Sequence, residues 1–293
     1  MRETALIVTA DDFGMSVPVN EAVEEAHRKG VLTCASLVVA GAAAGDAVRR
    51  ARKMPGLGVG LHLALIDAPS VLPRDQIPDL MNRQGEGLAA TPALTGARIA
   101  FDGAVRGQAR AEMRAQLSAY RATGLPLDHV DGHWHFHQHP GLLGLLIGMA
   151  AEFGVHAVRV PNEPVLASWR AAGRRGLLPR AGAALGQSWL WRRMRRRLGR
   201  AGIGCNDWFF GLRDSGAMTR DVLLGVLGHL PRGVSEIGTH PASRPPSGAH
   251  ALPAHYKVTE ELAALIDPDI IEACRGLRRG RFSDLVAPAG AAG

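Results

Sequence analysis

The chain has 293 residues, of which 46% are hydrophobic and 21% are charged, a composition typical of a globular protein with a sizeable core. A transmembrane helix is not predicted, because no window reaches the 18 or so uninterrupted apolar residues that a membrane-spanning helix needs. The formal net charge is +7. Ten arginines and no acidic residue fall between residues 164 and 206, so the basic character belongs to one segment.

The cysteines and the N-terminus indicate the compartment. Cys34, Cys205 and Cys274 are odd in number and widely spaced, which fits a reduced cytoplasm better than a disulfide framework. The first residues lack the order of basic, apolar and small residues that marks a signal peptide. We therefore expect a cytoplasmic protein.

The first part of the chain alternates between two kinds of pattern. Strands are predicted at residues 5–10, 33–40 and 59–65, with helices at residues 19–30 and from about 41 to 54. The first strand is an apolar run that ends at Asp11 and Asp12, which predicts a buried strand with two carboxylates at its carboxyl end. The third strand carries His62.

The later part of the chain repeats this alternation after an interruption. Residues 67–102 are rich in Pro and Gly and predict a loop or insertion. The elements expected after it are a helix at 104–123, a strand at 127–131, a helix at 141–153, and strands at 155–160 and 234–239. Such repeats favour one α/β domain over residues 1–285, a distorted TIM-like β/α barrel of parallel strands. Residues 286–293 are expected to be a disordered tail.

A cluster of histidines follows the fourth predicted strand. Five of the twelve histidines fall within eleven residues, at positions 129, 133, 135, 137 and 139. On an extended backbone the alternating four, from His133 to His139, would share one face. A site that requires imidazole is the simplest interpretation, and a polar histidine-rich loop is the alternative.

Chemically active side chains recur at the predicted strand ends, where parallel α/β folds place their functional groups. These are Asp11, Asp12, His62, the run from Asp131 to His137, Arg159 and His240. Two imidazoles and one carboxylate leave coordination positions open for water and substrate, as catalytic zinc requires. Taken singly, an aspartate pair at a strand end can have a structural or capping role, and a lone histidine can be a buried core residue. Together they predict a metal hydrolase.

Four motifs in order resemble those of the YdjC/ChbG-type carbohydrate deacetylases: TADDFG at 9–14, GLHL at 60–63, HVDGHWHFH at 129–137 and EIGTHPA at 236–242. VRVPNEP at 158–164 and NDWFFGL at 206–212 are similar to the hopanoid-biosynthesis-associated HpnK branch. The resemblance implies removal of the N-acetyl group from an N-acetylglucosamine unit, with an acetylglucosaminyl hopanoid as substrate. The alternatives are a deacetylase of soluble chito-oligosaccharides and a non-catalytic binding module on the same fold.

The resemblance also implies roles for individual residues. Asp12, His62 and His133 would bind one divalent metal ion, with zinc favoured over magnesium. Asp11 would be the general base, and His240 would stabilise the intermediate and protonate the leaving amine.

Other residues receive supporting roles. Asp131 is a candidate to orient a metal-binding histidine. Contacts with the substrate are expected from Arg159, Trp208, Phe209, His135 and His137. For Arg159 a structural ion pair is an equally weighted alternative, and the aromatic pair could instead belong to the core.

Residues 165–205 predict a basic amphipathic insertion. On a helix, Leu190, Trp191, Met194 and Leu198 would form one apolar face, surrounded by arginines. We expect this face to contact an anionic membrane surface, which would hold the protein at the inner face of the membrane. Nucleic acid is not an expected partner, because no known binding motif accompanies the arginines. A solvated arginine-rich face is the alternative, and the sequence leaves the oligomeric state open.

Overall fold

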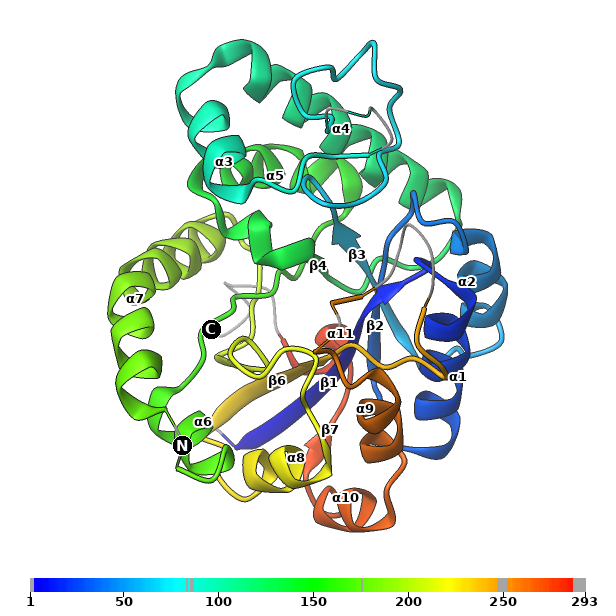
Figure 1. Cartoon of the computed structure of the whole chain (residues 1–293), viewed down its shortest axis with the longest axis vertical. Helices are drawn as coiled ribbons and strands as arrows, with labels where there is room; N and C mark the ends of the chain where they lie inside the picture. The colour runs from blue at the N-terminus through cyan, green and yellow to red at the C-terminus, as the bar shows by residue number, and fades with distance from the viewer. Residues whose placement is uncertain are drawn as a thin grey trace.

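The computed structural model describes residues 3–82, 84, 87–174, 176–246, 252–253 and 255–286, with the backbone alone for residues 179 and 183–185. A curled, parallel sheet lies at its centre (Figure 1). Its strands are β1 (Thr4–Phe13), β2 (Cys34–Leu37), β3 (Gly58–Leu63), β4 (Val130–Gly132), β5 (Trp208–Phe210), β6 (Gly233–Thr239) and β7 (Arg278–Arg279).

The order of the strands makes β1 the central strand. The sheet runs β4-β3-β2-β1-β6-β5, and β7 pairs with the first half of β1. Every pairing is parallel. Leu6, Ile7, Val8 and Ala10 of β1 are at most 1% exposed, because the two faces of a parallel sheet are both covered. The distorted TIM-like barrel predicted from the sequence is confirmed as a half-barrel.

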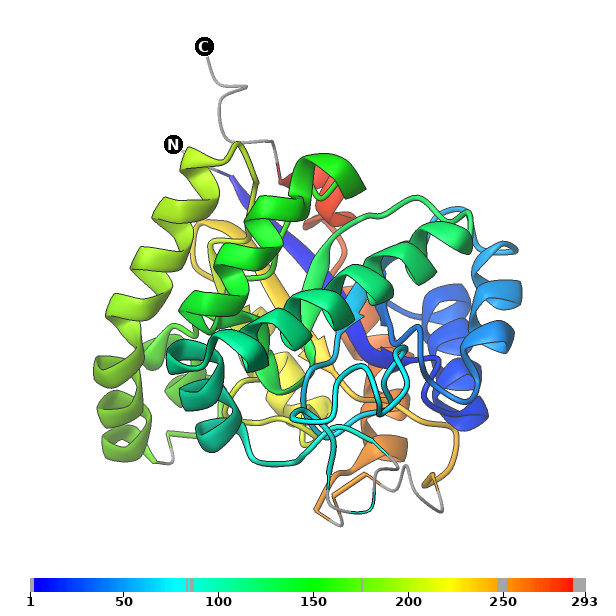
Figure 2. The same cartoon turned by 90° about the horizontal axis from the view of Figure 1, so that it is seen from above.

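Helices surround the sheet as an outer layer (Figures 1 and 2). They are α1 (Val17–Lys29), α2 (Ala44–Ala51), α3 (Pro92–Phe101), α4 (Gly103–Ala122), α5 (Pro140–Phe153), α6 (Val165–Ala171), α7 (Leu177–Arg200), α8 (Arg220–Leu227), α9 (Val258–Leu265), α10 (Pro268–Ala273) and α11 (Phe282–Leu285). Their ends follow local chemistry. Asp102 caps α4 by accepting hydrogen bonds from the amides of Ala104 and Val105, and α5 ends at Gly154 with a φ of 70°.

Several predicted elements differ from the structure. The predicted insertion contains helix α3, and residues 155–160 form only isolated bridges, from Val158 to Val130 and from Ala157 to Gly204. The short strands β5 and β7, helix α6 and helices α8 to α11 were not predicted. Of the expected disordered tail, residues 286–293, Val286 is placed and buried, and residues 287–293 lie outside the described residues.

The prediction of an extended histidine run is wrong. His133–Gln138 form a 3₁₀ helix, η1, in which Trp134 and His135 both have a φ of 53°. These left-handed residues turn the backbone, so the four histidines do not share one face. The alternation in the sequence therefore reflects a tight turn after β4 and not a strand.

The membrane-facing role predicted for Leu190, Trp191, Met194 and Leu198 is also wrong. Trp191, Met194 and Leu198 are at most 3% exposed and belong to the main hydrophobic core, and Leu190 is half-buried. Trp191 Nε1 donates a hydrogen bond to Gln138 Oε1 at 3.0 Å. An apolar stripe on a helix indicates burial but does not say what covers it, and here the protein's own core covers it. Within the described part of the chain, no helix has the length and apolar content to cross a membrane.

Candidate metal centre and active site

A cavity of about 600 Å³ opens at the carboxyl ends of the strands. Asp11, Asp12, His62, His133 and His240 all line it. They come from the ends of β1, β3 and β6 and from the turn after β4, because a parallel sheet delivers all its carboxyl ends to one edge. The fold thus brings the five residues of the predicted catalytic centre to one cavity.

Asp12, His62 and His133 can hold a metal ion. Asp12 Oδ1 lies 3.2 Å from His133 Nδ1 and 3.6 Å from His62 Nε2, and the three ligand atoms lie within 4.8 Å of one another. Asp12 Oδ1 is buried and has no hydrogen-bond partner among the described residues. A buried carboxylate oxygen without a donor is costly unless a cation binds it.

The backbone of β1 turns both aspartates into the cavity. Successive strand residues normally face opposite sides of a sheet. Here the register between β1 and β2 shifts between Ala10 and Phe13, and Asp12 has a φ of 63°. A non-glycine residue in the left-handed region is strained, and such strain gathers at functional sites. Asp11 and Asp12 can therefore serve the same cavity.

Asp131 sets the orientation of His62. Its Oδ1 lies 2.8 Å from His62 Nδ1, so Nδ1 donates a hydrogen bond to it and Nε2 is the nitrogen turned toward Asp12. Burial would lower the pKa of His62, but the carboxylates of Asp131, Asp11 and Asp12 outweigh it and raise the pKa to about 9. Burial would likewise raise the pKa of Asp12, yet His133 and His62 hold it well below its ordinary value.

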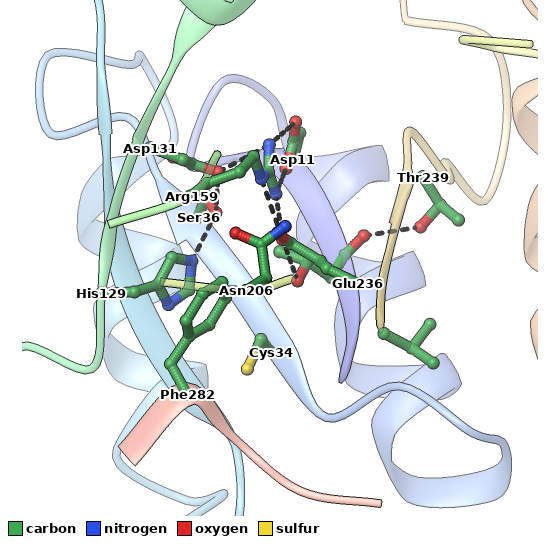
Figure 3. A network of polar contacts seen from close by, with 12 residues as sticks. Asp11, Cys34, Ser36, His129, Asp131, Arg159, Asn206, Glu236, Thr239 and Phe282 are labelled. Carbon is green, nitrogen blue, oxygen red and sulfur yellow. Dashed lines mark hydrogen bonds and ion pairs between the residues drawn. The ribbon is translucent and has the colours of Figure 1, made fainter. Parts of the chain in front are cut away.

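Arg159 does not face the substrate, contrary to the prediction. It is fully buried, and its guanidinium donates to Asp11 Oδ2 and Oδ1 at 2.8 and 2.9 Å. It also pairs with Asp131 Oδ2 at 2.8 Å and with Glu236 Oε1 at 2.7 Å (Figure 3). With its donors engaged by three carboxylates, Arg159 holds Asp11 and Asp131 in place. The structural ion pair, the alternative reading of the sequence, is what the structure contains.

Three more predicted substrate contacts do not line the cavity. His137 is 1% exposed, with Nε2 placed 2.9 Å from the carbonyl oxygen of Arg159. Phe209 is 1% exposed and packs between the Arg159 guanidinium at 4.9 Å and the His135 ring at 5.0 Å. Trp208 turns away and donates from Nε1 to the Arg232 carbonyl. Of the predicted contacts only His135 lines the cavity.

Other residues that sequence reasoning missed form the cavity wall. Tyr256 packs against His240 with ring centroids 5.2 Å apart, and its hydroxyl lies 2.8 Å from Ser215 Oγ. Trp134 is 58% exposed at the same cavity. Trp134 stands inside the histidine run and could have been noticed. No pattern marks Tyr256, which only the fold brings close to His240.

His240 is held by its backbone and not by its ring. Its amide donates to Glu261 of α9, whose carboxylate also accepts a hydrogen bond from the Met218 amide. Burial raises the pKa of Glu261. The His240 Nδ1 atom is buried without a hydrogen-bond partner among the described residues. The backbone of His240 is thus fixed, while its ring, at a residue that lines the cavity, keeps a nitrogen without a partner among those residues.

Two other groups of potential ligands are already satisfied. In the group Asp11, His62 and Asp131, the aspartates accept hydrogen bonds from Arg159 and His62. The third group lies deeper in the barrel and consists of Cys34, Asp128 and His129. There Asp128 accepts from the Ser283 hydroxyl and from two backbone amides. The group with an unsatisfied oxygen is therefore the one around Asp12.

Known proteins resemble the chain over most of its length. The family model for YdjC-like proteins matches residues 5–276. A carbohydrate deacetylase of Geobacillus stearothermophilus is 30% identical over 266 residues, covering 90% of each chain. One from Mus musculus is 33% identical over 291 residues, covering 90% of this chain and 89% of the other. A chitooligosaccharide deacetylase of Salmonella schwarzengrund is 32% identical over 167 residues, which are 56% of this chain and 62% of that protein.

The fold is also similar to that of a solved structure. A crystal structure of a protein from Enterococcus faecalis V583, named for a proposed cleavage of cellobiose phosphate, superposes with a TM-score of 0.70. It covers 97% of this chain and 99% of that chain at 22% identity, so the likeness bears on the fold alone. The family model and the two relatives matched over about nine-tenths of their length place the chain in the family of YdjC-like proteins.

Proposed function

We propose that this protein is a metal-dependent hydrolase that removes the N-acetyl group from an N-acetylglucosamine unit. One observation carries the proposal. The unsatisfied Oδ1 of Asp12 lies between two histidine nitrogens, in a cavity that Asp11 and His240 also line. Metal ligands, a candidate base and a candidate acid thus surround one space. The relatives that cover most of the chain are named carbohydrate deacetylases, which supports the same activity.

The three ligands fit a divalent ion, and zinc is the proposed one. Two imidazoles with one carboxylate form a catalytic zinc site with positions left for water and substrate. When bound, the ion would supply a Lewis acid that polarises the amide carbonyl and the attacking water. Asp131 supports this assignment by fixing the tautomer of His62, since the remaining nitrogen, Nε2, is the one turned toward Asp12.

Asp11 and His240 would handle the protons. Asp11 accepts a proton from the attacking water as the oxygen bonds to the acetyl carbon. His240 donates a proton to the sugar nitrogen as the C–N bond breaks, releasing acetate and the free amine. Arg159 donates hydrogen bonds to both oxygens of Asp11. These bonds fix the orientation of the carboxylate and leave lone pairs that can accept the proton of the water.

The cavity has room and flat surfaces for a sugar. Its volume of about 600 Å³ lies within the usual range for small-ligand sites. Trp134 and Tyr256 offer aromatic faces at its wall, the role assigned from the sequence to Trp208 and Phe209. We propose that these two rings stack on the pyranose.

For the substrate we propose an N-acetylglucosaminyl lipid, of the hopanoid type implied by the two HpnK-like segments. Apolar side chains, among them Met15, Val19, Leu88 and Leu252, line the same cavity and could take an apolar aglycone. Soluble chito-oligosaccharides are the second candidate, favoured by the relative named a chitooligosaccharide deacetylase. Turnover of the two substrate types by the purified protein separates them, and preference for the soluble sugar would overturn the lipid proposal.

We also propose contact with an anionic membrane surface, through the arginines of α7 and not through its apolar stripe. Arg192, Arg193, Arg196 and Arg200 are exposed, and Trp189 beside them is 57% exposed. An arginine near anionic headgroups contributes about 1 kcal/mol. Sedimentation with anionic vesicles at low salt should be lost when these arginines become glutamine. If the wild type does not sediment, the arginines form a solvated face.

The metal assignment is tested by alanine substitution of each ligand. Asp12→Ala, His62→Ala and His133→Ala should each lose bound metal and activity together, because two protein ligands hold a divalent ion poorly. Elemental analysis of the purified variants measures this. Ser70→Ala, outside the cavity, is the control. Full metal content in all three variants would show that the ion binds elsewhere.

The assignment of Asp11 as the general base predicts a different outcome, in which metal stays bound and turnover falls. Asp11→Asn should keep most of its metal while turnover falls by roughly 10²- to 10⁴-fold, the usual contribution of a general base. Asn keeps the shape of the side chain, so Arg159 retains one acceptor there. A wild type that binds metal and acetylated sugar without any turnover would instead identify a non-catalytic binding module.

A further inference from the structure

A buried chain of polar groups continues from His62 toward the floor of the barrel. We call Asp131, Ser36, His129 and Asp128 the relay. Ser36 Oγ lies 2.7 Å from Asp131 Oδ2 and 3.1 Å from His129 Nε2. His129 Nδ1 lies 3.0 Å from Asp128 Oδ2. All four residues are at most 5% exposed, and Figure 3 shows Ser36 between Asp131 and His129.

The proton positions in the relay follow from what each group can donate. Asp131 Oδ2 faces the Arg159 guanidinium at 2.8 Å, so it acts as an acceptor and Ser36 must give its single hydroxyl proton to it. The Ser36 oxygen is then an acceptor toward His129, and Nε2 of His129 must carry a proton. If Ser36 donated to His129 instead, two acceptor oxygens would meet at 2.7 Å.

The other ring nitrogen of His129 also faces an acceptor. Asp128 accepts from the Ser283 hydroxyl at 2.6 Å, from the Ser283 amide at 3.1 Å and from the Phe282 amide at 3.2 Å. Those donors keep Asp128 an acceptor-only carboxylate. Nδ1 of His129 must therefore donate as well.

We propose that His129 is a buried imidazolium and a positioning residue, which through Ser36 and Asp131 directs His62 toward the metal. The inference rests on the proposed function for its catalytic meaning. A ring with two N–H donors can hold Asp128 and Ser36 at the same time, and its Nε2 proton meets the Ser36 oxygen whose own proton goes to Asp131. Asp131, whose Oδ2 accepts the Ser36 hydrogen bond, keeps His62 Nδ1 protonated and its Nε2 turned toward Asp12.

The surroundings of His129 agree with a fixed, charged ring. Burial lowers its pKa, but Asp128, Asp131 and Glu236 outweigh burial and raise it. Phe282 stacks on the ring at a centroid distance of 4.4 Å. A Cβ atom at Gly60 would lie 2.5 Å from the ring, so the glycine of the GLHL motif leaves the space that the imidazole fills.

A metal ion at Cys34, Asp128 and His129 would be a different explanation of the same cluster. The oxygens of Asp128 already accept five hydrogen bonds, from His129, Phe282, Ser283 and the Cys34 thiol. Burial and the nearby Asp128 charge also raise the pKa of the Cys34 thiol well above its ordinary value, which opposes the thiolate that a metal needs. The contacts therefore favour a hydrogen-bonded network.

The ring charge can be measured without any metal. In ¹⁵N-labelled protein near neutral pH, the ring signals that disappear in His129→Gln belong to His129. We expect both of its nitrogens to carry protons and to remain so well above the ordinary histidine pKa of about 6.5. A neutral ring near neutral pH would overturn the inference, and would leave the proposed deacetylase function standing.

The positioning role is tested by Zn²⁺ affinity in competition with a chelator. Ser36→Ala and His129→Gln should each weaken Zn²⁺ binding roughly 10- to 100-fold, as lost supporting contacts do. Because they act through one path, the double variant should be little weaker than the worse single variant. Cys34→Ala, at the same depth and 3.6 Å from Asp128 but outside the path to His62, is the matched control and should bind normally.

The outcomes of the two measurements are separable. Multiplying effects in the double variant, or unchanged affinity in the small Ser36→Ala change, would overturn the positioning role. If His129→Gln does not fold, the ring signals that shift in Ser36→Ala identify His129, whose ring Nε2 lies 3.1 Å from Ser36 Oγ, and the Zn²⁺ affinity of Ser36→Ala tests the positioning role. A wild type that shows a doubly protonated ring but binds no Zn²⁺ would overturn the proposed function and not the assignment of charge to His129.

Discussion

Replacing Leu198 by alanine distinguishes a core helix from an interfacial one. Leu198 is fully buried, in the same core as Trp191 and Met194 of α7. On a membrane-facing stripe the same leucine would be exposed in the free protein, and truncating it would hardly change stability. Buried as it is, Leu198→Ala should destabilise the fold directly.

The magnitude follows from the burial. Truncating a fully buried leucine removes three carbon atoms from the core and leaves a cavity, which costs about 2–5 kcal/mol. Leu178 provides a control of the same residue type on the same helix, because it is 84% exposed. Leu178→Ala should change the free energy of unfolding by no more than about 0.5 kcal/mol.

The assay is urea unfolding of both variants and the wild type, followed by far-ultraviolet circular dichroism. A lower midpoint for Leu198→Ala at an unchanged denaturant slope would report lost stability rather than a changed unfolded state. The interfacial interpretation makes the opposite prediction. Equal stability of the two variants, together with weaker binding of Leu198→Ala to anionic vesicles, would refute the burial of this face.

Three further predictions concern charge and metal. Burial, reinforced by Asp214, raises the pKa of Glu163 from 4.5 to about 7. The stability contributed by protonated Glu163 is therefore full below pH 4.5 and is lost as the pH rises through about 7. Glu163→Gln cannot lose a proton, so it should be more stable than the wild type above that pH by up to about 3 kcal/mol. Urea unfolding across pH measures the difference. His240→Ala should keep its metal and lose roughly 10²- to 10⁴-fold in turnover, and near-normal turnover would exclude it as the acid. Chelation should lower the stability of the wild type, by about 2.7 kcal/mol relative to metal at a hundredfold excess over its Kd, while leaving His133→Ala unchanged in a thermal melt.

The sequence alone determined which residues meet at the proposed catalytic centre. Asp11, Asp12 and His240 lie at the ends of predicted strands and His62 lies near the end of another, and parallel strands deliver their carboxyl ends to one edge whatever the details of the helices. A local pattern is sufficient there, because the topology converts positions along the chain into proximity. Only the tertiary structure showed that Asp12 adopts a left-handed backbone and that its Oδ1 lacks a donor among the residues that the structure describes.

What the sequence could not decide depends on partners that are distant along the chain. Arg159 has the chemistry to bind a sugar, but Asp11, Asp131 and Glu236 occupy its donors. The pattern of the apolar stripe of α7 is compatible with a membrane surface and with a protein core, and in the structure the stripe packs into the core. A side chain's type and periodicity state what it can contact, whereas long-range packing determines which contact forms, and that is why these roles became clear only in the folded molecule.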